Sequence, residues 1–406
     1  MSGERPLDGL RVLELADEQA EWAGKLLADM GADVIKVESP GGATTRRIGP
    51  FVGDVPDPER SLNFWHYNTS KRSVTLDLAT RQGRALWLEL AARADVVLET
   101  AVPGALDALG IGYEALALTN PGLVMTSVTP WGPDGPYAGF VSGDLIQMAM
   151  SGIINSCGYD EHDIPPVRPG ANHSHHIASH HAVIGTLIAL YARDALGKGQ
   201  RVDIAVHDCA SVCVEFAATH WFYTQRFVER QTGRHAYPQI TARSSFLARD
   251  GHYASMSQTR DERVWREIVR WAHEAGLGEL FDQFGDATDR FARGSEVLGA
   301  YEALVAEMDS EEIWHRGQEL GMTWAAVRQP EDWLDDPHAI ARGFFHPIEH
   351  EGLAEPVYYP GPPYAFTAHP GRLTRAPHLG EHNAEVYGAL GYSAADLTAF
   401  REAGAI

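Results

Sequence analysis

Five of the chain's 19 histidines lie within one short stretch, residues 171–181, which reads ANHSHHIASHH. Imidazole side chains at this density could bind a metal ion, transfer protons, or line the start of a helix without a chemical role. His176 and His180 are four residues apart and would share one face of a helix, with His173 or His175 within reach as a third ligand. No HExxH motif or cysteine partner accompanies them, so we expect no metal site and leave acid–base chemistry and simple solvation open.

Alternating strand and helix patterns precede this stretch. Leu10–Leu15 has the pattern of a buried strand, Ala20–Met30 that of a helix ended by Gly31, and Asp33–Glu38 that of a second strand. The alternation continues over residues 73–78, 81–94, 95–100 and 123–128. Such repetition predicts an α/β fold whose mostly parallel sheet is covered by helices. Helices are predicted for residues 144–154 and 177–195.

The pattern changes after about residue 218. A strand pair around Ser244–Ser255 is followed by charged amphipathic helices at Glu262–Ala275 and Ser295–Met308. This change predicts a smaller α+β domain.

Composition narrows the possible functions. A formal net charge of −22 disfavours partners that need a basic face, so we expect neither nucleic-acid nor membrane binding. No apolar run approaches the roughly 20 residues of a membrane span, and the first residues do not form a secretory signal. The three cysteines have neither the number nor the spacing of a disulfide framework. We therefore predict a cytoplasmic protein.

Several motifs, taken in order along the chain, resemble the class III CoA-transferase family, which includes formyl-CoA transferase and α-methylacyl-CoA racemase. They are PLDGLRVL (6–13), LADMGADVIKVE (27–38), NTSKRS (68–73), GIGYE (110–114), GKGQ (197–200) and LGEHN (379–383). The resemblance implies a large Rossmann-like domain at 1–215 completed by 340–406, and a small domain with linkers at 216–339. It also implies an interlocked dimer of two ring-shaped chains.

The resemblance implies a carboxylate mechanism. In this family an aspartate attacks the acyl-CoA thioester, forms a mixed anhydride, and then carries the CoA as an aspartyl thioester. Its position falls on His175 here, and the histidine of the racemase branch falls on Gly143. The catalytic candidates are therefore His175 and Asp144, where Asp144 orients or protonates His175 or only caps the helix that it begins.

The CoA contacts implied by the resemblance are fewer than is usual in the family. Basic residues bind CoA phosphates in relatives, whereas Ala79, Ala108 and Val141 occupy such positions here. We predict weak binding of coenzyme A or acyl-CoA and no covalently bound cofactor. The binding candidates are Asp17, Glu18, Arg46, Arg47, Lys71, Arg72 and Thr100. For the basic ones, solvated surface charge or pairing with acids is the competing interpretation.

These observations leave three alternative hypotheses for the function. The first is a homodimeric CoA-transferase that acts on an acyl-CoA and a small carboxylic acid. The second is a repurposed isomerase, lyase or cyclase that uses His175 as a base, with or without CoA. The third is a non-catalytic subunit paired with a paralogous subunit that carries the aspartate.

Overall fold

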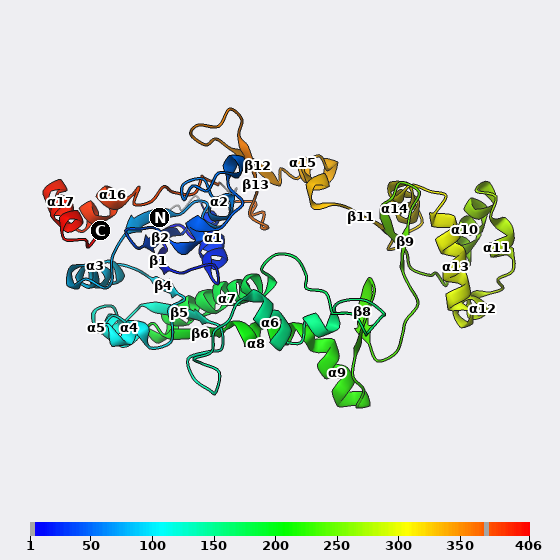
Figure 1. Cartoon of the computed structure of the whole chain (residues 1–406), viewed down its shortest axis with the longest axis horizontal. Helices are drawn as coiled ribbons and strands as arrows, with labels where there is room; N and C mark the ends of the chain where they lie inside the picture. Colours follow the sequence, from blue (N-terminus) through cyan, green and yellow to red (C-terminus); the bar gives the residue numbers. More distant parts are fainter. Residues whose placement is uncertain (1–4, 369–372) are drawn as a thin grey trace. The chain divides into compact units, whose positions relative to one another are not determined.

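The protein is described by a computed structural model that covers residues 5–368 and 373–406 (Figure 1). Its main sheet has six parallel strands in the order β3-β2-β1-β4-β5-β6. The strands are β1 (Arg11–Leu15), β2 (Asp33–Glu38), β3 (Arg72–Thr75), β4 (Val96–Glu99), β5 (Val124–Thr129) and β6 (Arg201–Ala205). The predicted α/β fold with a parallel sheet is confirmed.

Helices cover both faces of this sheet because apolar side chains alternate along its strands. Val12 and Val34 pack with α1 and α7 on one face, whereas Leu13 and Ile35 pack with α3 and α16 on the other. The helices of this part of the chain are α1 (Glu21–Asp29), α2 (Leu62–Tyr67), α3 (Arg81–Ala91), α4 (Ala105–Ala108), α5 (Tyr113–Thr119), α6 (Asp144–Met150), α7 (His173–Leu196), α8 (Val206–Ser211), α16 (Asn383–Ala389) and α17 (Ala394–Glu402). Short 3-10 turns η1 (Thr44–Arg47), η2 (Val52–Asp54) and η4 (Val212–Val214) and the strand pair β12 (Phe345–Ile348) and β13 (Val357–Pro360) complete it.

The order of the strands reverses between β1 and β4. The chain moves outward from β1 to β2 and β3, then returns to the other side of β1 with β4. In open α/β sheets, ligands bind in the crevice outside the carboxyl ends of the strands at such a reversal. We therefore expect a ligand to bind at the loops after Leu15 and Glu99.

The histidine stretch belongs to a helix that is longer than predicted. Helix α7 begins at His173, four residues before the predicted start, so that all five histidines of the stretch are helical. Helix α6 ends at Met150 instead of residue 154, and the 3-10 turn η3 (Ile154–Ser156) follows.

A second compact unit comprises Gly152–Pro169 and Val214–Ala339, and the first comprises Met1–Ser151, Gly170–Cys213 and Ile340–Ile406. The predicted strand pair near 244–255 is present as antiparallel β9 and β10, joined by β11 in one sheet. The elements of this unit are η3, α9 (Glu215–Thr224), β7 (Glu229–Gln231), β8 (Arg234–Tyr237), β9 (Ser245–Leu247), β10 (Tyr253–Ser255), α10 (Glu262–Glu274), α11 (Gly278–Asp282), α12 (Ala287–Ala292), α13 (Gly294–Val305), α14 (Ser310–Glu319), β11 (Ala325–Val327), η5 (Pro330–Leu334) and, across the boundary, α15 (Pro337–Ala341).

The first unit contains residues 340–406, whose helices α16 and α17 pack against the same core as β1 and α3. Residues 152–169 group with the second unit. The domain boundaries implied by the resemblance stay a prediction. Within the described ranges, no helix is both long and apolar enough to span a bilayer.

Candidate active site

The loops after β1 and β4 meet at the point where the strand order reverses. The backbone N–H of Asp17 donates a hydrogen bond to the Thr100 hydroxyl at 3.0 Å, and the Asp17 carboxylate accepts one from the Gln19 N–H at 3.0 Å. Glu18, between them, is exposed. Three of the predicted binding residues, Asp17, Glu18 and Thr100, are thus brought to one edge of the sheet.

Helix α7 borders the same loops. It packs against α1, and its Ser179 hydroxyl donates a hydrogen bond to the Gln19 carbonyl at 3.3 Å. The amino end of α6 meets the first turn of α7, where one oxygen of Asp144 accepts hydrogen bonds from the Ser174 N–H at 2.9 Å and from its hydroxyl at 2.7 Å. His175 follows Ser174 directly and is buried, as is Asp144. The two predicted catalytic residues are therefore held at neighbouring helix starts.

Aromatic and imidazole rings gather beside this helix start, around Trp22 of α1. We call Trp22, His66, Tyr67, His176 and His180 the Trp22 cluster. The His66 ring stacks on Trp22 with centroids 5.7 Å apart, and the His176 ring lies 5.1 Å away. The Tyr67 hydroxyl and the His176 Nε2 are 2.8 Å apart and form a hydrogen bond. Trp22 Nε1 donates to His180 Nε2 at 3.4 Å.

The imidazoles of this cluster are held neutral. Burial lowers the pKa of His66 to about 4, and the Lys25 charge adds to the effect. Burial also lowers the pKa of His176 to about 4, with a further contribution from neighbouring imidazoles. Neutral imidazoles accept or donate single hydrogen bonds but supply no positive charge for a phosphate. Within the part of the chain that the structure describes, no three His, Cys, Asp or Glu side chains are arranged to hold a metal ion.

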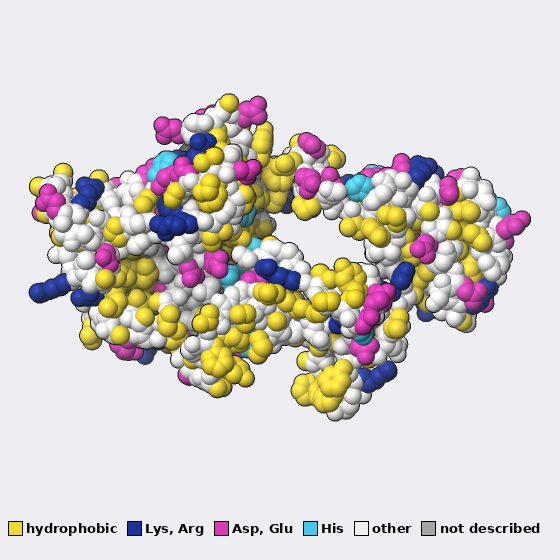
Figure 2. All heavy atoms as spheres, in the orientation of Figure 1, with side chains coloured by type: hydrophobic (Ala, Val, Ile, Leu, Met, Phe, Trp, Pro, Cys, Tyr) yellow, Lys and Arg dark blue, Asp and Glu magenta, His cyan; other side chains and the backbone are white. Residues whose placement is uncertain are grey.

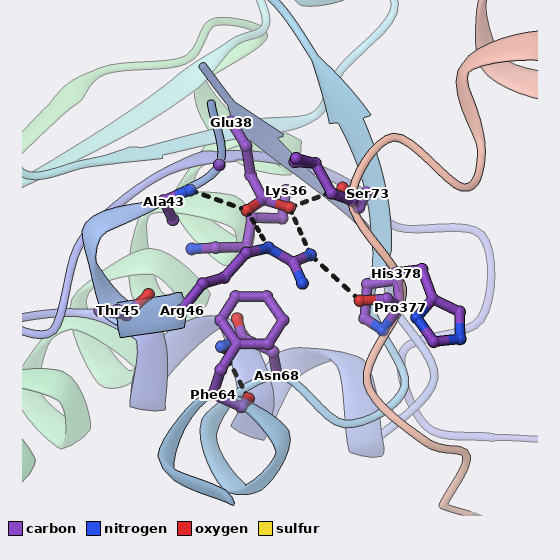
Figure 3. A network of polar contacts seen from close by, with 12 residues as sticks. Lys36, Glu38, Ala43, Thr45, Arg46, Phe64, Asn68, Ser73, Pro377 and His378 are labelled. Atoms are coloured by element: carbon purple, nitrogen blue, oxygen red, sulfur yellow. Dashed lines mark hydrogen bonds and ion pairs between the residues drawn. The ribbon is translucent and has the colours of Figure 1, made fainter. Parts of the chain in front are cut away.

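Arg46, a predicted CoA contact, is buried and bound by other groups. Its Nε and NH2 donate to the two oxygens of Glu38 at 2.7 and 2.9 Å, and NH2 also donates to the Pro377 carbonyl at 3.1 Å (Figure 3). Its guanidinium lies 3.8 Å from the centre of the Phe64 ring. Burial alone would raise the pKa of Glu38, but the hydrogen bonds and charge of Arg46 lower it below its usual range. Arg46 thus ties η1 to β2 and to the chain near Pro377.

Lys71 belongs to a buried group of charges that the sequence patterns did not predict. Its Nζ lies 2.7 Å from a Glu14 oxygen and donates to the Glu21 carbonyl at 2.9 Å. Lys36 bridges the same two acids, at 2.9 Å from Glu14 and 2.7 Å from Glu21. These four side chains are at most 3% exposed. Charged residues inside the apolar strand patterns LRVLEL and DVIKVE were the available signal.

The remaining basic candidates lie elsewhere. Arg72 is the first residue of β3, at the amino ends of the strands, and pairs with Asp33 at 2.6 Å and Glu385 at 3.0 Å. Arg47 is exposed and donates to the Gly41 carbonyl at 2.8 Å. The structure therefore does not bring the seven candidates together at one place, and a role of the basic ones in CoA binding stays a prediction.

Comparisons with known proteins agree with this architecture. The family model described as CoA-transferase family III matches residues 7–383. The chain is 33% identical to succinyl-CoA:(R)-benzylsuccinate CoA-transferase subunit BbsE of Thauera aromatica, with 98% of this chain and 97% of that protein covered. It is 33% identical to succinyl-CoA–D-citramalate CoA-transferase of Chloroflexus aurantiacus, over 94% of this chain and 93% of that protein.

A solved structure shows the same likeness in three dimensions. The crystal structure of a CaiB/BaiF family protein from Brucella suis aligns with a TM-score of 0.83 at 31% identity, covering 95% of this chain and 99% of that one. The family model spans nearly the whole chain, so the resemblance predicted from its motifs is confirmed, and with it the enzyme class. This chain, with His175 at the start of α7, belongs to CoA-transferase family III.

Proposed function

We propose that this protein takes part in CoA transfer between an acyl-CoA, such as succinyl-CoA, and a carboxylic acid, as one subunit of an enzyme whose partner chain supplies the nucleophilic carboxylate. The names of relatives support an assembly of two kinds of chain. The Thauera aromatica relative is a subunit, and two Chloroflexus aurantiacus relatives are named as alpha and beta subunits of succinyl-CoA–L-malate CoA-transferase.

The chemistry of the carrier supports this division of labour. A carboxylate that attacks a thioester expels the CoA thiolate and forms a mixed anhydride. The thiolate then attacks the enzyme's carbonyl in that anhydride, which releases the acyl group as a free carboxylate and leaves CoA on the enzyme as a thioester. An imidazole that attacks the same thioester forms an acyl-imidazole, which cannot become a CoA thioester of the enzyme. With His175 at the position that the family resemblance assigns to the nucleophile, this chain lacks the carrier there.

The contact between Asp144 and Ser174 carries the proposal. Asp144 brings a carboxylate to the first turn of α7, but one of its oxygens accepts two hydrogen bonds from Ser174. Hydrogen bonds to a carboxylate stabilise its charged form and fix its orientation, which makes it a poorer nucleophile. We therefore assign Asp144 to positioning the start of α7, next to His175, and the CoA-carrying carboxylate to the partner chain.

Exposed apolar side chains support an association with another chain. Ile184, Ile188 and Tyr191 follow one another at helical spacing along α7 and are 55%, 62% and 82% exposed. In the second unit, hydrophobic side chains gather over α9, where Phe222 and Tyr223 are 78% and 86% exposed (Figure 2). Patches of this kind mark protein–protein interfaces. An interlocked dimer with the paralogous, Asp-bearing subunit is the assembly we expect.

An exchange assay tests the proposal. The purified chain is incubated with succinyl-CoA and radiolabelled succinate, alone and after co-purification with a family III chain that has an aspartate at the position of His175. Label should enter succinyl-CoA only with the partner present. Replacement of the partner's aspartate by alanine should abolish exchange, whereas His175→Ala in this chain should leave at least part of it. Exchange by this chain alone would contradict the proposal.

The neutral imidazoles also favour a second function, acid–base catalysis by a histidine. His176 is held neutral and is hydrogen-bonded to Tyr67 beside His175, which suits proton abstraction by a histidine base more than phosphate binding. An isomerase, lyase or cyclase that works without a partner chain would require such a histidine base. Solvent-deuterium incorporation into an acyl-CoA by the isolated chain, lost in His175→Ala, would favour it over CoA transfer.

A further inference from the structure

A cavity of about 140 Å³ lies at the amino ends of the strands, the edge opposite the loops after β1 and β4. Strands β1 and β2, the end of α3 and helix α16 form its walls, all within the first compact unit. Its lining is mostly apolar and belongs to the main core behind the sheet. The apolar lining residues of that core are Leu13, Ile35, Leu90, Ala94, Val386 and Leu390. Ala389 also lines the cavity but is exposed. An apolar cavity of about 150 Å³ is large enough to hold one benzene ring.

Three arginines line the cavity beside these apolar groups. Arg11 and Arg72 share the carboxylate of Asp33, with Nε–oxygen distances of 2.9 and 2.8 Å, and Arg72 also donates to Glu385 at 3.0 Å. Arg93 is exposed, and its NH1 donates to the Ala389 carbonyl at 2.6 Å. These arginines and the two acids leave one positive charge in excess, at an opening into the apolar core.

We propose that this cavity binds a small carboxylic acid with a flat apolar body about the size of a phenyl ring. The apolar body would lie against Leu90 and Val386, where its surface leaves water. The carboxylate would meet Arg93, whose guanidinium has five donors, one of which contacts Ala389. A neutral ligand would forgo the charge-assisted bond, and a ligand without an apolar body would leave the cavity unfilled.

This inference goes beyond the proposed CoA transfer because the cavity and the loops after β1 and β4 lie at opposite ends of the same strands. A carboxylic acid is also the kind of compound that the proposed reaction consumes. The experiment must therefore tell the two places apart.

Calorimetric titration of the full chain with benzoate tests the cavity. We expect one site with a Kd of roughly 1 mM, within the range open to a ligand of this size. Benzyl alcohol and acetate should each bind at least about tenfold more weakly. Arg93→Ala should weaken benzoate binding roughly tenfold to a hundredfold, whereas Arg81→Ala, an exposed arginine on α3 outside the lining, should not.

A cavity-filling variant locates the binding. Ala389→Phe, at an exposed position of the lining, should abolish benzoate binding. Ala384→Phe, also exposed on the same helix but outside the lining, should leave it unchanged. His175→Ala should also leave it unchanged. Unaltered binding by a folded Ala389→Phe protein, equal losses in both phenylalanine variants, or loss on His175→Ala would each overturn the assignment. The readout is binding, so failure here would not bear on the exchange activity.

Discussion

One carboxylate oxygen of Asp144 accepts hydrogen bonds from the backbone N–H and the hydroxyl of Ser174, which lies thirty residues further along the chain. Asn172, at the N-cap position of α7, makes no side-chain capping bond, so Asp144 provides from another helix what a local cap would provide. This contact explains why α7 begins early enough to include His175.

Removal of this carboxylate should destabilise the first unit. Asp144→Ala leaves the buried Ser174 donors without that acceptor, which should lower the free energy of unfolding by about 1–3 kcal/mol. Asp144→Asn keeps an acceptor oxygen and should cost less. Urea denaturation followed by circular dichroism measures both. Equal stability of Asp144→Ala and the parent chain would contradict the capping role.

Arg46 should matter for stability more than for CoA binding. Arg46→Ala leaves the buried Glu38 carboxylate without its bidentate partner and should cost about 3–5 kcal/mol. Arg47→Ala, at an exposed neighbour, should change stability by less than about 0.5 kcal/mol and serves as the matched control. An Arg46→Ala protein that is as stable as the parent but has lost CoA binding would show that Arg46 contacts CoA instead.

CoA itself should bind weakly. Arg46 and Lys71 are held by buried acids, and each missing charge-assisted phosphate contact removes roughly 1.5–3 kcal/mol, or one to two decades of affinity. Calorimetric titration with free CoA should give a weaker Kd than an Asp-bearing relative gives in the same buffer. Submicromolar affinity would contradict this expectation.

Stability should fall on mild acidification. The pKa values of His66 and His176 are lowered by burial from 6.5 to about 4, so the unfolded state binds more protons between these values. The contribution of these two histidines to the free energy of unfolding should therefore be present well above pH 6.5 and be lost as the pH falls from there toward 4, by at most roughly 1.4 kcal/mol per pH unit for each histidine. Between pH 6.5 and 5, His66→Gln should show a shallower slope than the parent chain. An unchanged slope would mean that His66 does not titrate in this way.

A carboxylate at position 175 tests whether the rest of the site is competent. His175→Asp should give exchange of labelled succinate into succinyl-CoA above the background of the parent chain if its own CoA site is intact. His175→Asn, of similar size without a charge, is the control and should stay silent. If both variants are folded and neither shows exchange above background, CoA contacts as well as the nucleophile come from the partner chain.

Local patterns in the sequence predicted five of the six strands of the main sheet, whereas β6 was not predicted. Leu10–Leu15 and Asp33–Glu38 appear as β1 and β2 with one end shifted by one residue at most, because buried strands carry a continuous apolar signal. The motifs along the chain were sufficient to predict its membership of CoA-transferase family III. Within the site, the sequence indicated Asp17 and Thr100, which the reversal of strand order brings together.

Contacts between distant residues could not be predicted. The start of α7 depends on Asp144, thirty residues away, and Arg46 is bound by the Pro377 carbonyl, 331 residues away. In the structure Arg46, Lys71 and Arg72 each pair with acidic side chains, as the competing interpretation of these basic residues predicted. Their acidic partners lie on other strands and helices. Charge and motif alone do not reveal such partners.

A measurement of enzyme-bound CoA tests most directly whether the partner chain, and not this chain, carries the CoA thioester. The purified chain, alone and with its Asp-bearing partner, is incubated with succinyl-CoA, treated with borohydride to reduce any aspartyl thioester to the alcohol, and digested for mass spectrometry. We expect a reduced aspartate in the partner chain of the mixture and no modified residue in this chain under either condition. A reduced Asp144, or any reduced acidic residue in this chain when it is incubated alone, would contradict it.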